Sequence, residues 1–293
     1  MVVGPDSSTP KSGPDTRLGI VLRVAFFVAS VFVTLRLSML FLYWQFGIVV
    51  AATVGACAGG LLANWLTMRI FDRRPFADVG LPVNPASAQN FALGLLLGGG
   101  AAALMLVAPL LAGSGHLVAH TGPAPNFWSL IFYLGALGLA AAGEELMFRG
   151  YAFQLLVEKI GPFATVLPVA VIFGLAHASN PHPSILGITN TILWGVLLGF
   201  AFLRSHDLWL PIGLHWAWNL VLPLFGVNLS GLTIGITRYD YRWDLLPLWS
   251  GGEYGPEGGL LATIFIVALF FALLKSPVKP QRAAIAQSLN EPL

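Results

Sequence analysis

Eight apolar runs dominate this sequence, and their length restricts how the chain can fold. They cover approximately residues 18–35, 43–66, 90–112, 127–148, 163–179, 184–204, 208–225 and 259–275. A helix rises 1.5 Å per residue, so about 20 apolar residues are needed to cross about 30 Å of hydrocarbon. A backbone in lipid must satisfy its own hydrogen bonds, which favours helices. The sequence therefore predicts an all-α, polytopic membrane helical bundle with about eight transmembrane helices.

Composition supports a membrane protein and excludes other classes. Only 10% of the residues are charged and the mean hydropathy is +0.78, whereas soluble domains carry about 25% charge. The net charge of +2 and the absence of a basic cluster argue against a nucleic-acid partner. Cys57 is the single cysteine, so no intramolecular disulfide can form. The expected partner is the lipid bilayer.

The positions of Lys and Arg predict the orientation of the chain. If the N-terminus is cytosolic, 12 of the 15 basic residues fall on the cytosolic side. The other three are Arg36, Arg238 and Arg242. Both termini are therefore expected to be cytosolic. Residues 1–17 are rich in Gly, Pro and Ser and are predicted to form a disordered cytosolic tail. The first apolar run is too long for a signal peptide and is read as a retained span.

Two adjacent carboxylates, Glu144 and Glu145, interrupt the fourth apolar run. A charge near the centre of a bilayer costs about 2.5–3.5 kcal/mol, and such residues usually face the bundle interior and mark function. Arg149 follows Glu145 by four residues and can pair with it. Glu144 points about 100° away, without a partner on its own helix. A structural salt bridge would explain the pair but not Glu144, whose free carboxylate suits a general base.

Two of the six histidines fall within predicted spans, namely His177 and His215. His215 and Asn219 are four residues apart, so they share one face of a helix. A packed, hydrogen-bonded histidine is the alternative interpretation for either imidazole. The remaining four histidines are expected at the surface: His116, His120, His182 and His206.

The distances of Glu144, His177 and His215 from the predicted turns indicate that these side chains can lie at a similar depth in the membrane. Glu144 and His177 each lie about 16 residues from the predicted turn at 159–162, or ~24 Å along a helix. They are therefore expected to be level on neighbouring antiparallel helices. His215 reaches the same level if the segment 149–160 projects ~10 Å into the cytosol.

This set of side chains suits the hydrolysis of a peptide bond. Glu144 would take a proton from an attacking water that His177 holds. His215 and Asn219 would donate hydrogen bonds to the developing oxyanion. Neither GxSxG nor HExxH is present. No cofactor is expected, although zinc held by Glu144, His177 and His215 stays open as a less favoured alternative.

Three short motifs carry a resemblance to a known family. EELMFRG (144–150) resembles an EExxxR signature, FGLAH (173–177) an FxxxH element and HWAWN (215–219) an HxxxN element. In this order, on separate spans, they resemble the CAAX-protease and bacteriocin-processing family, also called abortive-infection-like. The resemblance covers about residues 125–225. It implies an intramembrane peptidase that is glutamate-dependent rather than zinc-dependent.

The resemblance also implies roles for residues of this chain. Glu144 and His177 would activate water, His215 and Asn219 would form the oxyanion hole, and Glu145 and Arg149 would support the site. The expected substrate is a membrane-tethered protein or peptide, either a prenylated CaaX type or bacteriocin-like, and the expected location is a bacterial plasma membrane.

The predicted organisation has four parts after the tail. They are N-terminal spans with a cytosolic loop (18–124), a catalytic core (125–225), a solvated, partly amphipathic external loop (226–257), and a last span with a cytosolic tail (258–293). Two other functions stay open. One is a non-catalytic immunity or signalling partner. The other is a transporter that uses Glu144 and the histidines as a proton relay, although no internal repeat supports it.

Overall fold

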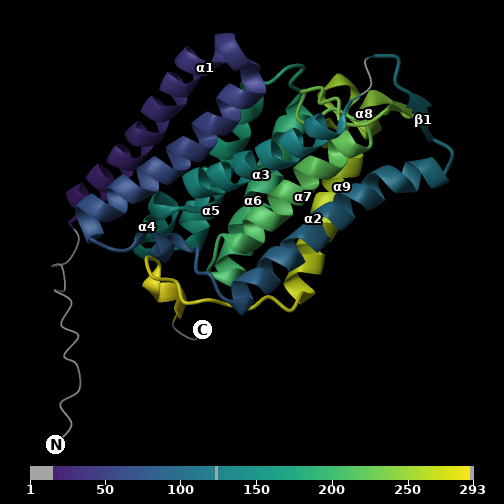
Figure 1. Ribbon diagram of the computed structural model, residues 1–293. Helices are drawn as coiled ribbons and strands as arrows, with labels where there is room; N and C mark the ends of the chain where they lie inside the picture. Colours follow the sequence, from purple (N-terminus) through teal and green to yellow (C-terminus); the bar gives the residue numbers. More distant parts are fainter. Residues whose placement is uncertain (1–15, 123–124, 291–293) are drawn as a thin grey trace, which may run out of the picture.

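The structure is a computed structural model that describes residues 16–122 and 125–290, so most of the predicted N-terminal tail lies outside the described residues. It is a bundle of helices with one small two-stranded sheet (Figure 1). The helices are α1 (Arg17–Thr67), α2 (Pro85–Leu111), α3 (Phe127–Arg149), α4 (Tyr151–Ile160), α5 (Pro162–Ala176), α6 (Ile185–Ser205), α7 (Trp209–Leu224), α8 (Pro247–Ser250) and α9 (Leu260–Lys275). Short 3₁₀ or π turns are η1 (Met68–Asp72), η2 (Phe76–Val79), η3 (His177–Ser179), η4 (Gly252–Tyr254), η5 (Pro256–Gly258) and η6 (Gln287–Asn290). Strands β1 (Gly115–Ala119) and β2 (Tyr239–Trp243) pair antiparallel.

The membrane character of the chain is confirmed, but the count of about eight spans is not. Five helical segments are long and apolar enough to cross a bilayer, and α9 is apolar but shorter. Those five segments are Arg17–Asp72, Pro85–Leu111, Phe127–Ile160, Pro162–Ser179 and Ile185–Ser205. Every predicted apolar run is nevertheless helical. The difference arises partly because α1 contains the first two runs.

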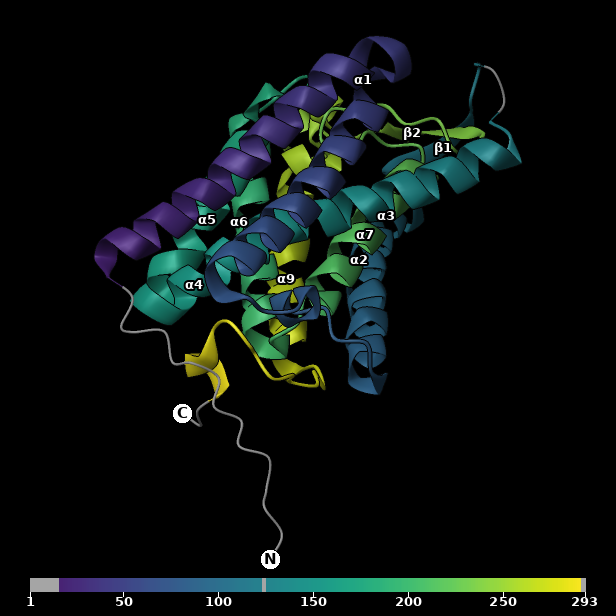
Figure 2. The ribbon, with the colours of Figure 1, turned by 60° about the vertical axis from the view of Figure 1, so that its left-hand side comes forward.

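α1 folds back on itself at Gly47, whose φ of 79° lies in the region that favours glycine. The two arms run antiparallel, since Gly55 packs against Leu35 and Ser38 (Figure 2). The first arm continues well past residue 35, where the predicted span ended. Arg36 therefore lies inside a helix and not in a loop.

Glycines let helices approach closely where the site is built. A Cβ at Gly98 of α2 would overlap the backbone of Leu214 in α7. A Cβ at Gly143 of α3 would likewise overlap the backbone of Ala56 in α1. Small residues allow this kind of backbone contact between membrane helices. These contacts fix α7 and the C-terminal part of α3 in position.

The segment that follows α7 differs from its prediction as a solvated loop. Its first part is buried in the core through Val227, Leu229, Ile234 and Ile236. Apolar residues at every second or third position from Val227 to Ile236 give this segment one apolar side. The apolar side of this partly amphipathic segment is therefore buried in the bundle and not left in solvent. Figure 1 shows the segment against the ends of the bundle helices.

The two ends of the described chain meet at one end of the bundle. Arg23, near the start of α1, contacts the Tyr151 hydroxyl of α4 at 3.4 Å. The Ser288 backbone N–H, near the end of the chain, donates to the Glu158 carboxylate of α4 at 2.7 Å. Figure 2 shows the C-terminal segment next to α4. This places both ends on the same side of any membrane that the bundle spans.

Candidate active site

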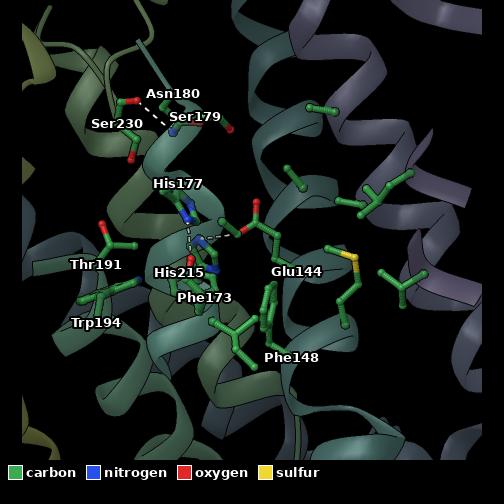
Figure 3. Close-up of a pocket in the computed structure, with 18 of the residues that line it drawn as sticks. Glu144, Phe148, Phe173, His177, Ser179, Asn180, Thr191, Trp194, His215 and Ser230 are labelled. Atoms are coloured by element: carbon green, nitrogen blue, oxygen red, sulfur yellow. Dashed lines mark hydrogen bonds and ion pairs between the residues drawn. The ribbon is translucent and has the colours of Figure 1, made fainter. Parts of the chain in front are cut away.

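All four predicted catalytic side chains line one cavity of about 1010 Å³: Glu144, His177, His215 and Asn219. Its walls are formed by residues of α1, α3, α4, α5, α6, α7 and α9 and of the segment that follows α7. Figure 3 shows Glu144 facing His177 and His215 across the cavity. The structure therefore brings together residues that are up to 75 positions apart in the sequence.

The predicted ion pair between Glu145 and Arg149 lies behind the cavity wall, and both residues are fully buried. Arg149 Nη1 lies 3.2 Å from Glu145 Oε1, and Nη2 donates to the Gly195 carbonyl at 2.8 Å. The guanidinium carbon lies 4.9 Å from the centre of the Phe173 ring. Arg149 therefore links α3 to α6 and neutralises the carboxylate of Glu145.

Glu145 has a second partner that the sequence did not reveal. His215 Nδ1 lies 2.8 Å from Glu145 Oε1. A carboxylate accepts, so Nδ1 carries the proton of this hydrogen bond. His215 Nε2 then faces Glu144, whose Oε2 lies 3.8 Å away. Glu145 thus orients the imidazole of α7, as a carboxylate does for a catalytic histidine in other hydrolases.

The Glu144 carboxylate has no partner on its own helix, as its position predicted, and its contact with His215 Nε2 at 3.8 Å is too long for a hydrogen bond. Within residues 16–122 and 125–290, its Oε2 has no hydrogen-bond partner. The side chain is 25% exposed, and it lines the cavity. Gly143, directly before it, packs on the backbone of α1 and holds the carboxylate at this place. The charge-rich end of the cavity is therefore open to a ligand.

His177 lies where α5 gives way to the turn η3. Its Nδ1 lies 2.9 Å from the Phe173 carbonyl oxygen. A carbonyl only accepts, so Nδ1 is the donor and Nε2 keeps its lone pair. In this state His177 offers a hydrogen-bond acceptor at its Nε2.

Glu144 and His177 were predicted to lie at the same depth on neighbouring antiparallel helices, and a contact between two aromatic rings agrees with this. Phe148, one turn after Glu144, meets Phe173, one turn before His177, with ring centroids 5.1 Å apart. Residues one turn further along two antiparallel helices are again opposite each other. The sequence predicted one continuous helix up to about residue 160. In fact α3 ends at Arg149, and Gly150 separates it from α4.

Asn64, which the sequence did not single out, hydrogen-bonds to backbone groups on both sides of the break at Gly150. Its Oδ1 accepts from the Tyr151 N–H at 2.7 Å, and its Nδ2 donates to the Leu146 carbonyl at 2.8 Å. Asn64 is fully buried. A lone amide within an apolar run was the signal that could have identified it, because such a group must find a partner in lipid.

Asn219 also lines the cavity, one turn after His215. Its side-chain amide makes no hydrogen bond to another residue in the described part of the chain. This leaves a donor available in the cavity wall. Among the residues that the structure describes, no group of three or more His, Cys, Asp or Glu side chains is arranged to hold a metal ion.

The fold and the cavity define an integral membrane protein with a polar site enclosed among apolar helices. Residues 126–221 match the family model of Rce1-like type II CAAX prenyl endopeptidases. This match confirms the resemblance to the CAAX-protease family, on about a third of the chain. It implies a peptide hydrolase, and the matched segment contains all six predicted site residues. No curated protein is similar enough to the chain to count as a match.

Proposed function

We propose that this protein is an intramembrane endopeptidase that hydrolyses a peptide bond of a membrane-associated substrate, with Glu144 activating the water. One observation carries the proposal. A carboxylate without a hydrogen-bond partner and an imidazole with a free lone pair line the same apolar cavity. The match to a family of prenyl endopeptidases supports it.

Water activation follows from the two acceptors. A water molecule in the cavity can donate one hydrogen to Glu144 and the other to His177 Nε2, and its oxygen then faces a substrate carbonyl. As the oxygen forms a bond to the carbonyl carbon, Glu144 takes the proton. The C–N bond then breaks, and the proton passes from Glu144 to the leaving amine. A positioned general base of this kind contributes about 10²- to 10⁴-fold to the rate.

His215 and Asn219 would stabilise the oxyanion. The Asn219 amide donates as it stands. His215 already uses Nδ1 on Glu145, so its Nε2 donates only when the ring is an imidazolium. Two carboxylates and one guanidinium leave one negative charge in the cluster, and the imidazolium balances it. Donors placed where negative charge develops are usually the largest electrostatic contribution to acyl transfer.

The cavity suits a substrate that arrives from the lipid. Its apolar wall includes Val28 and Phe32 of the first arm of α1 and Ile172 of α5. All three side chains are more than half exposed. In a bilayer this part of the wall borders the lipid, so a lipid-anchored peptide can reach the carboxylate without leaving the membrane. Both a prenylated CaaX peptide and a bacteriocin-like peptide fit this description.

The test is cleavage of a panel of prenylated and other membrane-tethered peptides by the purified protein in detergent. The Glu144→Gln and His177→Ala variants are expected to lose at least about 100-fold in rate, with no effect of a chelator on the wild type. Matched controls are Glu253→Gln and His182→Ala, which alter an exposed pair at 3.1 Å outside the cavity. Full activity in Glu144→Gln would refute the mechanism.

The remaining outcomes separate the other functions. Loss of activity with a chelator and its return with zinc would make the same residues metal ligands. Binding of a membrane partner with no cleavage of any peptide would favour an immunity or signalling role. We further propose that the protein resides in a bacterial plasma membrane with both termini in the cytosol.

A further inference from the structure

Buried polar atoms in folded proteins nearly always have a hydrogen-bond partner, so the exceptions need an explanation. Within the described residues, five buried side-chain atoms have none. They are Glu144 Oε2, Glu145 Oε2, Arg149 Nε, Trp194 Nε1 and Tyr254 Oη. The first three belong to the charged cluster described above. Of the other two residues, Trp194 lines the catalytic cavity and Tyr254 does not.

Trp194 forms part of the wall of the catalytic cavity. It lies in α6 and is 6% exposed. The next residue is Gly195, whose carbonyl accepts from Arg149 at 2.8 Å, so α6 is fixed in height relative to the charged cluster. Figure 3 shows the indole in the wall across from Glu144, with its nitrogen on the edge turned toward the catalytic side chains.

The orientation of this indole is fixed by its neighbours. Its ring lies on the ring of Trp218, with centroids 4.8 Å apart. Trp218 Nε1 donates to Glu257 Oε1 at 3.0 Å. Glu257 Oε2 accepts from both the backbone N–H and the hydroxyl of Ser230, each at 2.7 Å. Trp194 therefore cannot easily turn its N–H toward another acceptor.

We propose that the Trp194 indole N–H binds a backbone carbonyl oxygen of the substrate and so positions the peptide beside Glu144. An indole N–H is a donor only, so its partner must be an acceptor atom. A peptide in the cavity offers carbonyl oxygens at every residue. An unpaired buried donor destabilises the free protein, and a substrate that satisfies it recovers that free energy on binding. This inference rests on the proposed peptidase function.

The test replaces Trp194 with β-(3-benzothienyl)alanine, which keeps the ring shape but has sulfur in place of the N–H. Because no protein hydrogen bond is lost, the melting temperature is expected to stay equal or rise. For cleavage of a prenylated CaaX peptide, KM is expected to rise about 5- to 20-fold while kcat changes little, the pattern of a lost contact that the ground state and the transition state share. A Trp194→Phe variant also removes the N–H, but it leaves a gap beside Trp218, so its KM and not its melting temperature gives the comparison.

The matched control is the same replacement at Trp216, outside the cavity. Its Nε1 donates to the Leu134 carbonyl at 3.1 Å, so here the melting temperature is expected to fall and KM to stay unchanged. If Trp194 behaves like Trp216, the proposal is wrong. Equal losses in kcat and kcat/KM without a change in KM would also overturn it, because they would indicate a contact made only in the transition state.

A binding measurement separates this inference from the proposed function. In the Glu144→Gln background, the affinity for the same peptide can be measured whether or not the protein cleaves it. An affinity weakened about 5- to 20-fold by the Trp194 replacement would support the substrate contact even if the wild type cleaves nothing. An unchanged affinity would overturn the inference and leave the peptidase proposal untouched.

Discussion

The ion pair between Glu145 and Arg149 should be one of the strongest local interactions in this protein. Both residues are fully buried, with 3.2 Å between Arg149 Nη1 and Glu145 Oε1. At an effective dielectric constant of about 20, unit charges at this distance attract by about 5 kcal/mol. Removal of Glu145 leaves the Arg149 charge buried without its partner, which usually costs about 3–5 kcal/mol. Removal of Arg149 leaves Glu145 with His215, so this loss should be smaller. We therefore expect Glu145→Gln to lower the free energy of unfolding by about 3–5 kcal/mol and Arg149→Met to lower it by less.

The double variant decides whether this reasoning is correct. In Glu145→Gln/Arg149→Met no buried charge is left over from the pair, so its loss should be smaller than the sum of the single losses by at least about 2 kcal/mol. The measurement is denaturant unfolding in detergent micelles, analysed as a double-mutant cycle. Additive losses would refute the argument. The control cycle uses Arg74 and Asp78, a partly exposed pair with the same spacing and 3.7 Å between charged atoms, where coupling should stay below about 1 kcal/mol.

Three further predictions concern the parts around the site. Burial raises the pKa of Asp207, in the turn before α7, against the opposing effect of its hydrogen bond from Asn90. The folded protein then holds this proton more tightly than the unfolded chain, so the free energy of unfolding should fall as the pH rises from the unfolded pKa through the folded pKa. When unfolding is measured at several pH values, Asp207→Asn should remove this dependence of stability on pH. In a thermal-unfolding assay, Gly98→Val should lower the stability by about 1–3 kcal/mol and remove most of the activity, because the side chain pushes α7 away from α2. Gly100→Ala should be nearly neutral in the same assay, because an added Cβ there would meet no atom of another segment within 4 Å. A single cysteine at Ser288, in a Cys57→Ala background, should react with a membrane-impermeant maleimide only from the cytosolic side.

The features that the sequence predicted well are local ones. The helical runs follow from apolar length alone. The pairs at positions 145 and 149, and 215 and 219, follow from the helical repeat, which places residues four apart on one face. Each of these expectations needs only the geometry of a single helix, so no knowledge of the fold was necessary.

The features that it did not predict depend on contacts between distant segments. Glu145 and His215 are 70 residues apart, and no local pattern connects them. Asn64 and Gly150 interact across α1 and α3, and the break that they form changes where α3 ends. Trp194 has no distinguishing sequence pattern, because its significance lies in the partner that its N–H lacks. Such facts become visible only after the helices are packed.

Packing also explains why two adjacent glutamates can have different roles. On a helix, Glu144 and Glu145 point about 100° apart, so they face different surroundings. Glu145 turns into the bundle, where Arg149 and His215 fix and neutralise it. Glu144 turns into the cavity, where no side chain is close enough to hydrogen-bond to its Oε2 in the described part of the chain. A carboxylate that must accept a proton from water has to be free of a direct hydrogen bond from a protein donor, and a carboxylate that orients a histidine has to be held by one. A glutamate can therefore act as the general base or orient a histidine. The direction in which its side chain points determines which role Glu144 and Glu145 each have.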